Sequence, residues 1–226
     1  MLTVHHLDNS RSQRVLWLLE ELGVPYEIAF YKRDPETMLA PRELRAVHPL
    51  GKAPVVTIDD GGERVVLAES GAILEELVDR YGEGRLRPAP GTQAARDYRY
   101  WMHYAEGSAM SPLLLKLIFG ELPKRAPWLV KPLVGAIAKK AQSAFIDPQL
   151  KTHMGWWEAS LEGRDFLAGE FTAADIQMSF PVEAGLARAA KAGTYPRVEA
   201  YLARLHARPA WKKALERGGP YAILGG

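Results

Sequence analysis

The stretch HPLGKAPVV, residues 48–56, contains the feature of the sequence that most constrains the fold. Val55, Val56 and Ile58 favour strands and lack helical spacing, so they predict a buried strand. Pro54 stands at its head, although proline has no backbone N–H to donate to a sheet. A turn would explain this proline, and so would a site whose unusual backbone leaves neighbouring polar groups free for a ligand.

Hydrophobic spacing on either side of this stretch predicts a small mixed sheet flanked by helices. Two strands joined by a helix should be parallel, and two later strands joined by a hairpin at 59–62 must be antiparallel. A helix with buried Ile73 and Leu77 should end at Gly82. The predicted strands cover 2–6, 26–31, 54–58 and 64–68; the other predicted helices end before Gly23 and lie around 42–46.

Residues 82–92, GEGRLRPAPGT, are rich in Gly and Pro and predict a linker. They divide the chain into an α/β domain, 1–81, and an all-helical domain, 93–226. One long helix is expected over 93–119, and the last regular helix carries Val198, Tyr201, Leu202 and Leu205.

Two further helix starts are expected in the helical domain. Asp147 should cap a helix with Pro148 at its first position. Thr172 and Asp175 have the spacing of a capping box, in which each side chain accepts the other residue's backbone N–H.

Composition excludes several classes of function. The 226 residues are 47% hydrophobic and 25% charged, and the net charge of +2 is too small to indicate a nucleic-acid-binding protein. The chain has no cysteine, which excludes disulfides, thiolate metal sites and a cysteine nucleophile and fits a reducing compartment. No signal peptide, membrane span or metal site is expected.

Three segments of the α/β domain should converge on one site. Asn9, Ser10 and Ser12 stand at the start of a helix, where hydroxyls and free amides stabilise an anion. Glu69 and Ser70 follow a strand and begin another helix, and HPLGKAPVV lies between the two. Taken alone, Ser10 or Ser12 is better explained by simple helix capping, and capping explains Glu69 and Ser70 as well as a binding site does. As a site, Ser70 would bind a carboxylate and Glu69 an ammonium group, so the ligand would be an amino acid or peptide.

These segments, taken with LAESGAILEEL and FLAGEFTAADIQMSFP, resemble a cytosolic glutathione S-transferase over essentially the whole chain. The chain is most similar to a bacterial and fungal serine-type subgroup with LDxSRxxRxLWLLEEL, YKRD and ADIxMSFP. The resemblance implies a thioredoxin-like N-terminal domain, a helical C-terminal domain and a cytoplasmic homodimer that acts in detoxification. Glutathione would be a co-substrate and no cofactor would be needed.

The resemblance also implies roles for individual residues. Pro54 matches the family's cis-proline, which would turn the Ala53 backbone toward the cysteinyl unit of glutathione. Glu69 and Ser70 match the pair that binds the γ-glutamyl end, and Lys52 matches a polar position near the glycyl end or the thiol. A hydrophobic pocket for the electrophile would be formed by Leu7, Tyr100, Trp101, Tyr104, Ser108 and Met110, although an aromatic stripe at helical spacing also fits a core.

The thiol partner is expected to be Ser10, which stands four residues before Arg14 as in serine-type members of the family. Asn9 and Ser12 are the alternatives. The hydroxyl would stabilise the thiolate for attack on a hydrophobic electrophile, or for reduction of a peroxide. A non-catalytic binder of glutathione or hydrophobic ligands on the same scaffold is the alternative function.

Residues 124–140, KRAPWLVKPLVGAIAKK, form a basic amphipathic stretch. Such a stretch can lie on a membrane surface, close over the active-site cleft or pack as an ordinary helix. Packing or a lid is favoured here over the membrane.

Overall fold

The N-terminal third of the chain forms a four-stranded mixed sheet with the strand order β2-β1-β3-β4. In the computed structural model, which describes residues 1–219, β1 (Leu2–Leu7) pairs in parallel with β2 (Glu27–Tyr31). On its other side β1 pairs antiparallel with β3 (Val55–Asp60), which pairs antiparallel with β4 (Glu63–Ala68). The predicted strand directions are therefore confirmed.

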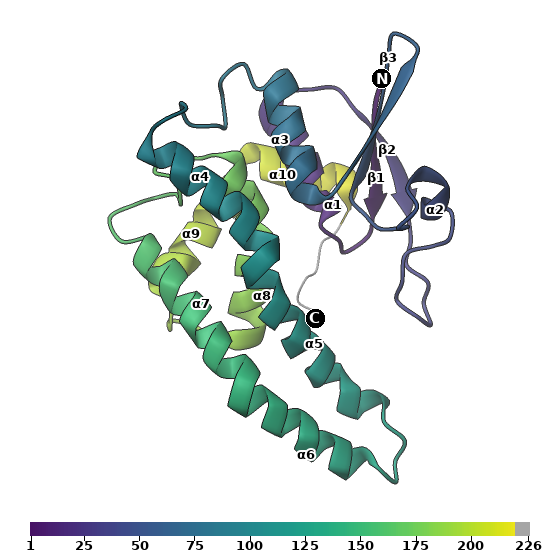
Figure 1. Ribbon diagram of the computed structural model, residues 1–226, viewed down its shortest axis with the longest axis vertical. Helices are drawn as coiled ribbons and strands as arrows, with labels where there is room; N and C mark the ends of the chain where they lie inside the picture. The colour runs from purple at the N-terminus through teal and green to yellow at the C-terminus, as the bar shows by residue number, and fades with distance from the viewer. Residues whose placement is uncertain (220–226) are drawn as a thin grey trace.

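Helices α1 (Ser12–Leu22) and α3 (Ser70–Tyr81) lie together on the side of the sheet that faces the C-terminal helices, as Figure 1 shows. The short α2 (Leu44–Val47) follows the charged segment after β2. β1 and β4 end where β3 begins, since Val55 pairs with both His5 and Ala68, and α1 and α3 follow from those two strand ends. The ends of these elements position the candidate site.

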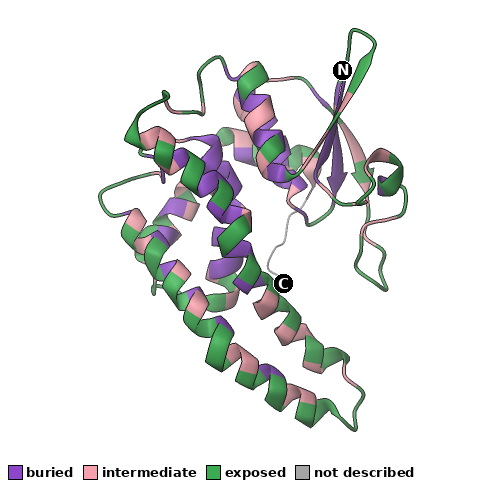
Figure 2. Cartoon of the chain, in the orientation of Figure 1, coloured by how far each residue is buried: buried purple, intermediate pink, exposed green. Residues whose placement is uncertain are grey.

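The rest of the described chain is largely helical, with small isolated bridges at 166–170. Its helix α8 (Ala173–Ala189) is buried along most of its length and packs against α1, α3 and α4 (Figure 2). The capping box predicted for Thr172 and Asp175 is present at its start. The other elements are α4 (Gln93–Tyr104), η1 (Ala105–Ala109), α5 (Met110–Arg125), α6 (Lys131–Ala141), η2 (Gln142–Ile146), α7 (Asp147–Ser160), α9 (Pro196–Ala207) and α10 (Pro209–Gly218).

Two π-helical turns correct the predicted helix boundaries. The single helix expected over 93–119 is interrupted by η1, and the helix expected to begin at Asp147 instead continues from η2. Proline has no N–H to donate to the carbonyl of the residue four positions earlier in a helix. In both cases that residue lies in the π turn: Ser108 precedes Pro112 by four residues, and Ala144 precedes Pro148 by four. The wider turn shifts the hydrogen-bond register around the proline, so the helix continues.

Helix α10 is an element that hydrophobic spacing did not predict. It packs against α1, where the rings of Trp17 and Trp211 meet edge to face with centroids 5.0 Å apart. The helix brings the C-terminal end of the described chain against the β1–α1 region.

The basic amphipathic stretch 124–140 covers the end of α5, a loop and most of α6. These two helices form a hairpin that extends away from the sheet in Figure 1, and α6 packs against α5 and η2. Ala138 is buried, whereas Trp128, Leu129 and Leu133 are exposed. Among the helices of residues 1–219, none is both long and apolar enough to cross a membrane.

Candidate functional site

Five of the residues predicted from sequence line one small pocket between the sheet and the helices. Its cavity volume is about 120 Å³. It lies where the chain enters β3, leaves β4 and begins α3. The lining residues are Arg11, His48, Leu50, Lys52, Ala53, Pro54, Ala68, Glu69, Ser70 and Glu106.

The peptide bond between Ala53 and Pro54 is cis, as predicted. Pro54 is buried and directly precedes β3, whose first residue, Val55, pairs with His5 of β1 and Ala68 of β4. Lys52 is exposed at the edge of the same pocket.

Glu69 and Ser70 stand at the junction of β4 and α3. Glu69 is exposed and has φ +69°, a left-handed backbone that is unfavourable for a residue with a side chain. Such conformations concentrate at ligand sites because the surrounding structure must hold them. Ser70 is buried at the first turn of α3, where free backbone N–H groups and the helix dipole favour an anion.

The hydrogen bonds of Ser70 leave its proton for a ligand. Its Oγ accepts a bond from Arg14 Nη1 at 3.2 Å and another from Gln177 Nε2 at 3.1 Å. A hydroxyl oxygen has two lone pairs, and both are occupied by these donors. The Ser70 O–H is therefore a hydrogen-bond donor at the pocket, which suits a carboxylate.

Arg14 connects this pocket to the C-terminal helices. Its side chain is 1% exposed, and its Nη1 also donates to Glu106 Oε1 at 2.6 Å and to Gln177 Oε1 at 3.2 Å. Arg11 lies on the solvent side of the same carboxylate, 3.1 Å away. Sequence reasoning used Arg14 only for its spacing from Ser10 and missed Arg11, Glu106 and Gln177, because their convergence depends on tertiary packing.

The candidate thiol partners lie in the loop between β1 and α1. Ser10 and Ser12 are both buried and their hydroxyl oxygens are 2.7 Å apart, whereas Asn9 is exposed with φ +47°. The Ser12 hydroxyl also bonds the backbone of Leu7: its oxygen can accept from the Leu7 N–H, and its proton can be donated to the Leu7 carbonyl oxygen. These serines are not among the residues that line the pocket, but Arg11 between them is.

The residues expected to form the hydrophobic pocket fall into two groups. Leu7, Trp101, Tyr104 and Met110 are buried, and all but Leu7 are packed into the main core. Tyr100 and Ser108 are exposed and line, with Tyr104, a surface hollow of about 590 Å³. Burial raises the pKa of Tyr104 to about 12, so its hydroxyl stays protonated, and it contacts His153 and accepts from Trp157.

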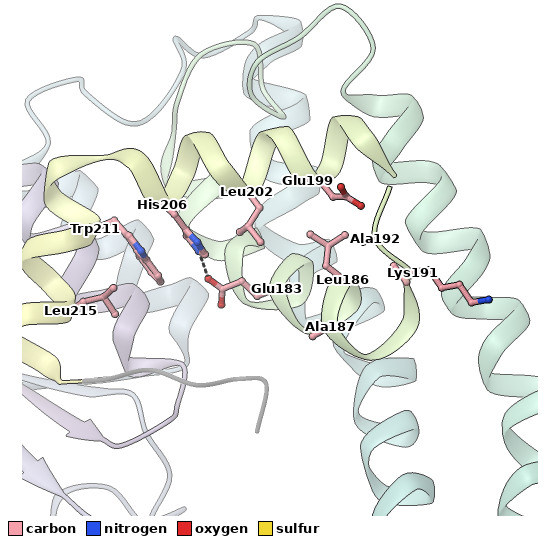
Figure 3. A pocket seen from close by; sticks show the side chains of 11 residues that line it. Glu183, Leu186, Ala187, Lys191, Ala192, Glu199, Leu202, His206, Trp211 and Leu215 are labelled. Atoms are coloured by element: carbon pink, nitrogen blue, oxygen red, sulfur yellow. Dashed lines mark hydrogen bonds and ion pairs between the residues drawn. The ribbon is translucent and has the colours of Figure 1, made fainter. Parts of the chain in front are cut away.

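Another cavity, of about 530 Å³, lies between α8, α9 and α10, and Figure 3 shows it. Leu186, Leu202 and Leu215 line it together with the hydrogen-bonded side chains of Glu183 and His206, whose Oε1 and Nε2 are 2.6 Å apart. It shares no lining residue with the pocket at Ser70 and so is separate from the candidate site. Within residues 1–219 there is no group of three or more His, Cys, Asp or Glu side chains suited to a metal ion.

Comparisons with known proteins identify the family to which the sequence is related. Residues 10–80 match the family model for the N-terminal domain of glutathione S-transferases. The chain is 30% identical to glutathione S-transferase 1 of Saccharomyces cerevisiae, over 96% of this chain and 95% of that protein. It is 34% identical to glutathione S-transferase 3 of Schizosaccharomyces pombe, over 96% of this chain and 88% of that protein.

A crystal structure of a glutathione S-transferase from Actinobacillus pleuropneumoniae has the same fold. It superposes with a TM-score of 0.81 at 37% identity, covering 99% of this chain and 95% of that one. The chain shares its sequence over nearly the full length with these proteins, and it has the mixed sheet and helical C-terminal part of the solved structure. This chain therefore belongs to the glutathione S-transferase family.

Proposed function

We propose that the protein is a glutathione transferase, which binds glutathione against the N-terminal α/β part and presents its thiolate to a hydrophobic electrophile. The observation that carries the proposal is the Ser70 hydroxyl. Both of its lone pairs are occupied by donors, it lies at the start of α3, and Glu69 stands beside it in the same pocket. This arrangement is complementary to an α-amino acid group, which the γ-glutamyl end of glutathione carries.

In this proposal the rest of glutathione lies along the pocket wall. The cysteinyl unit would contact the backbone of Ala53 before the cis bond to Pro54, and Lys52 would supply a cation to the glycyl end or the thiol. The thiol would then point toward the start of α1. Of the three candidates there, Ser10 is our choice of thiolate donor; Asn9 and Ser12 are the alternatives.

Stabilisation of the thiolate accounts for the chemistry. A free thiol has a pKa of about 8.5, so little thiolate exists at neutral pH. A hydroxyl donor and the N-terminal amides of α1 favour the anion and lower the thiol pKa. Each unit of lowering corresponds to about 1.4 kcal/mol. The thiolate attacks an electrophilic carbon held close to it, or the oxygen of a peroxide.

The electrophile would bind on the C-terminal side of the thiol. Glu106 already borders the glutathione pocket, and Tyr100, Tyr104 and Ser108 belong to the same continuous helical segment. Leu7, Trp101 and Met110 would form the buried wall of this electrophile site. We further propose that the protein is a homodimer and acts in detoxification. Its location would be the cytoplasm, where the glutathione pool resides.

The test is turnover. Conjugation of glutathione to an activated aryl halide should be measurable, and Ser10→Ala should lower kcat and move the pH profile to higher pH. Peroxide reduction is assayed in parallel with the same variant. Glutathione binding without turnover on any electrophile or peroxide would instead establish the non-catalytic binder on this scaffold, and no binding of glutathione would refute both functions.

A further inference from the structure

A continuous string of hydrogen bonds runs beneath the β1–α1 loop from Ser10 to the end of α10. The hydroxyl oxygens of Ser10 and Ser12 are 2.7 Å apart, and Ser12 Oγ is 2.9 Å from His6 Nδ1. The other ring nitrogen, His6 Nε2, is 3.0 Å from the carbonyl oxygen of Gly218. All three side chains are at least 94% buried, so bulk water does not compete for these bonds.

The Gly218 carbonyl determines the direction of every bond in the string. A carbonyl only accepts, so Nε2 carries the ring proton and Nδ1 of the neutral imidazole is an acceptor. Ser12 then donates its proton to Nδ1, and Ser10 donates to Ser12. In this state the proton of Ser10 is directed inward, away from any ligand.

Protonation of His6 reverses the string. The imidazolium donates from Nδ1 to Ser12 Oγ, which also accepts the backbone N–H of Leu7 at 3.2 Å. Both lone pairs of Ser12 are then occupied, and its own proton turns to the carbonyl oxygen of Leu7, also 3.2 Å away. Ser12 no longer accepts from Ser10, so the Ser10 hydroxyl is released to donate outward.

We propose that His6 accepts the proton of the glutathione thiol through Ser10 and Ser12, an inference that rests on the proposed function. The thiol S–H bond breaks and its proton passes to Ser10 Oγ. The proton of Ser10 passes to Ser12 Oγ, and that of Ser12 passes to His6 Nδ1. The products are a thiolate, two intact hydroxyls and an imidazolium, so protons and charge balance. Ser10 then donates to the thiolate.

The surroundings of His6 suit a base rather than a permanent cation. Phe30 of β2 contacts its ring edge to face with centroids 5.8 Å apart, and Gln13 of α1 lies on the α10 side near Gly218. Burial lowers the pKa of His6, while the Gly218 carbonyl and the nearby Asp8 partly oppose that shift. His6 is therefore neutral at pH 7 and able to take a proton. It acts on the thiol through two serines and is a positioning residue.

His5 provides a matched control. It is the neighbouring residue of β1, equally buried, and its ring nitrogens also bond side chains: Tyr31 Oη at 3.0 Å and Thr57 Oγ1 at 3.2 Å. Its side chain points to the other face of the strand and has no link to Ser10. His6→Gln keeps a donor and an acceptor but cannot be protonated. It should lower kcat by about 10²-fold and leave KM for glutathione near wild type.

Comparable losses of kcat in His6→Gln and His5→Gln would overturn the proposal, because the effect would then be structural. The pH profile gives the second readout. The acidic limb of kcat/KM should be lost in His6→Gln and kept in His5→Gln. Retention of that limb in both variants would also overturn the proposal.

Nitrogen NMR of the His6 ring in the wild-type protein tests the same step without a variant. Glutathione should shift Nδ1 toward the imidazolium value, whereas S-methylglutathione, which has no thiol proton, should not. Identical spectra with both ligands would refute the relay. A protein that binds neither ligand refutes the proposed function itself, whereas binding and turnover with an unchanged His6 refute only the relay.

Discussion

The buried guanidinium of Arg14 donates a hydrogen bond of 3.2 Å to the hydroxyl of Ser70, which is 56 residues away in sequence. This bond joins the first helix of the chain to the start of α3. Gln177 of α8 donates to the same hydroxyl, so the C-terminal helices contribute directly to the pocket of the N-terminal part. The orientation of the Ser70 proton, and with it the ability to bind a carboxylate, depends on three elements.

Ser70→Ala should weaken glutathione binding and also lower the free energy of unfolding by about 1–3 kcal/mol, because Arg14 and Gln177 each lose an acceptor in a buried place. Isothermal titration calorimetry and urea unfolding measure the two effects. Ser179→Ala is the matched control, since Ser179 is also buried and its hydroxyl donates to the Ile176 carbonyl of its own helix. Equal glutathione affinities in the two variants would contradict the assigned role of Ser70.

Glu69→Gln should weaken binding of glutathione while leaving the affinity for its analogue without the γ-glutamyl amine unchanged. Glu69 is exposed, so the expected loss is modest, about 0.5–1 kcal/mol or a few-fold in Kd. Titration of both ligands into both proteins completes a double-mutant cycle. A coupling energy of zero would mean that Glu69 does not contact the amine.

Acid should destabilise the fold in two separate pH ranges. Burial lowers the pKa of His5, His6 and His153 below 6.5, so their unfolded forms bind more protons than the folded forms as the pH falls through 6.5. The stability that comes from keeping them neutral is fully present above pH 6.5 and is lost below it. Urea unfolding from pH 8 to pH 5 should therefore show a plateau and then a decline. A free energy of unfolding that rises below pH 6.5 would contradict this sign.

The second pH range is the one in which the Glu20 carboxylate becomes protonated. Hydrogen bonds from Lys213, Tyr26 and Arg217 outweigh burial and lower the pKa of Glu20 from 4.5. Its stabilising effect is present above pH 4.5 and is lost as the pH falls through the lowered value. Glu20→Gln should flatten this second decline and leave the decline near pH 6.5 unchanged.

Two helical glycines should respond to alanine with opposite signs. A Cβ at Gly185 of α8 would come within 2.8 Å of both Met154 and Trp157 of α7, so Gly185→Ala should destabilise the fold by about 1–3 kcal/mol. A Cβ at Gly155 of α7 would meet no atom of residues 1–219 within 4 Å, so Gly155→Ala should stabilise the fold by about 0.5–1 kcal/mol. Thermal and urea unfolding of the two variants check the pair. Equal effects would show that α7 and α8 do not pack closely at Gly185.

The α/β part of the fold was predictable from the sequence because its signals are local. Alternation over 26–31, the hairpin at 59–62 and glycines after α1 and α3 each act within a few residues. The helical part was less predictable. The sequence predicted one α-helix over 93–119 and a helix start at Asp147, whereas in the structure π turns that contain Ser108 and Ala144 precede the prolines.

The sequence by itself determined the strands, the capping box and the chemistry available at Pro54, Glu69 and Ser70, because short-range sterics and residue type are sufficient for these. Only the tertiary structure decided which groups face them. Arg14 and Gln177 reach Ser70 from different helices, and Gly218 of the unpredicted α10 orients His6. Hydrogen-bond direction depends on partners far apart in the chain, and the packing of a whole core brings those partners together.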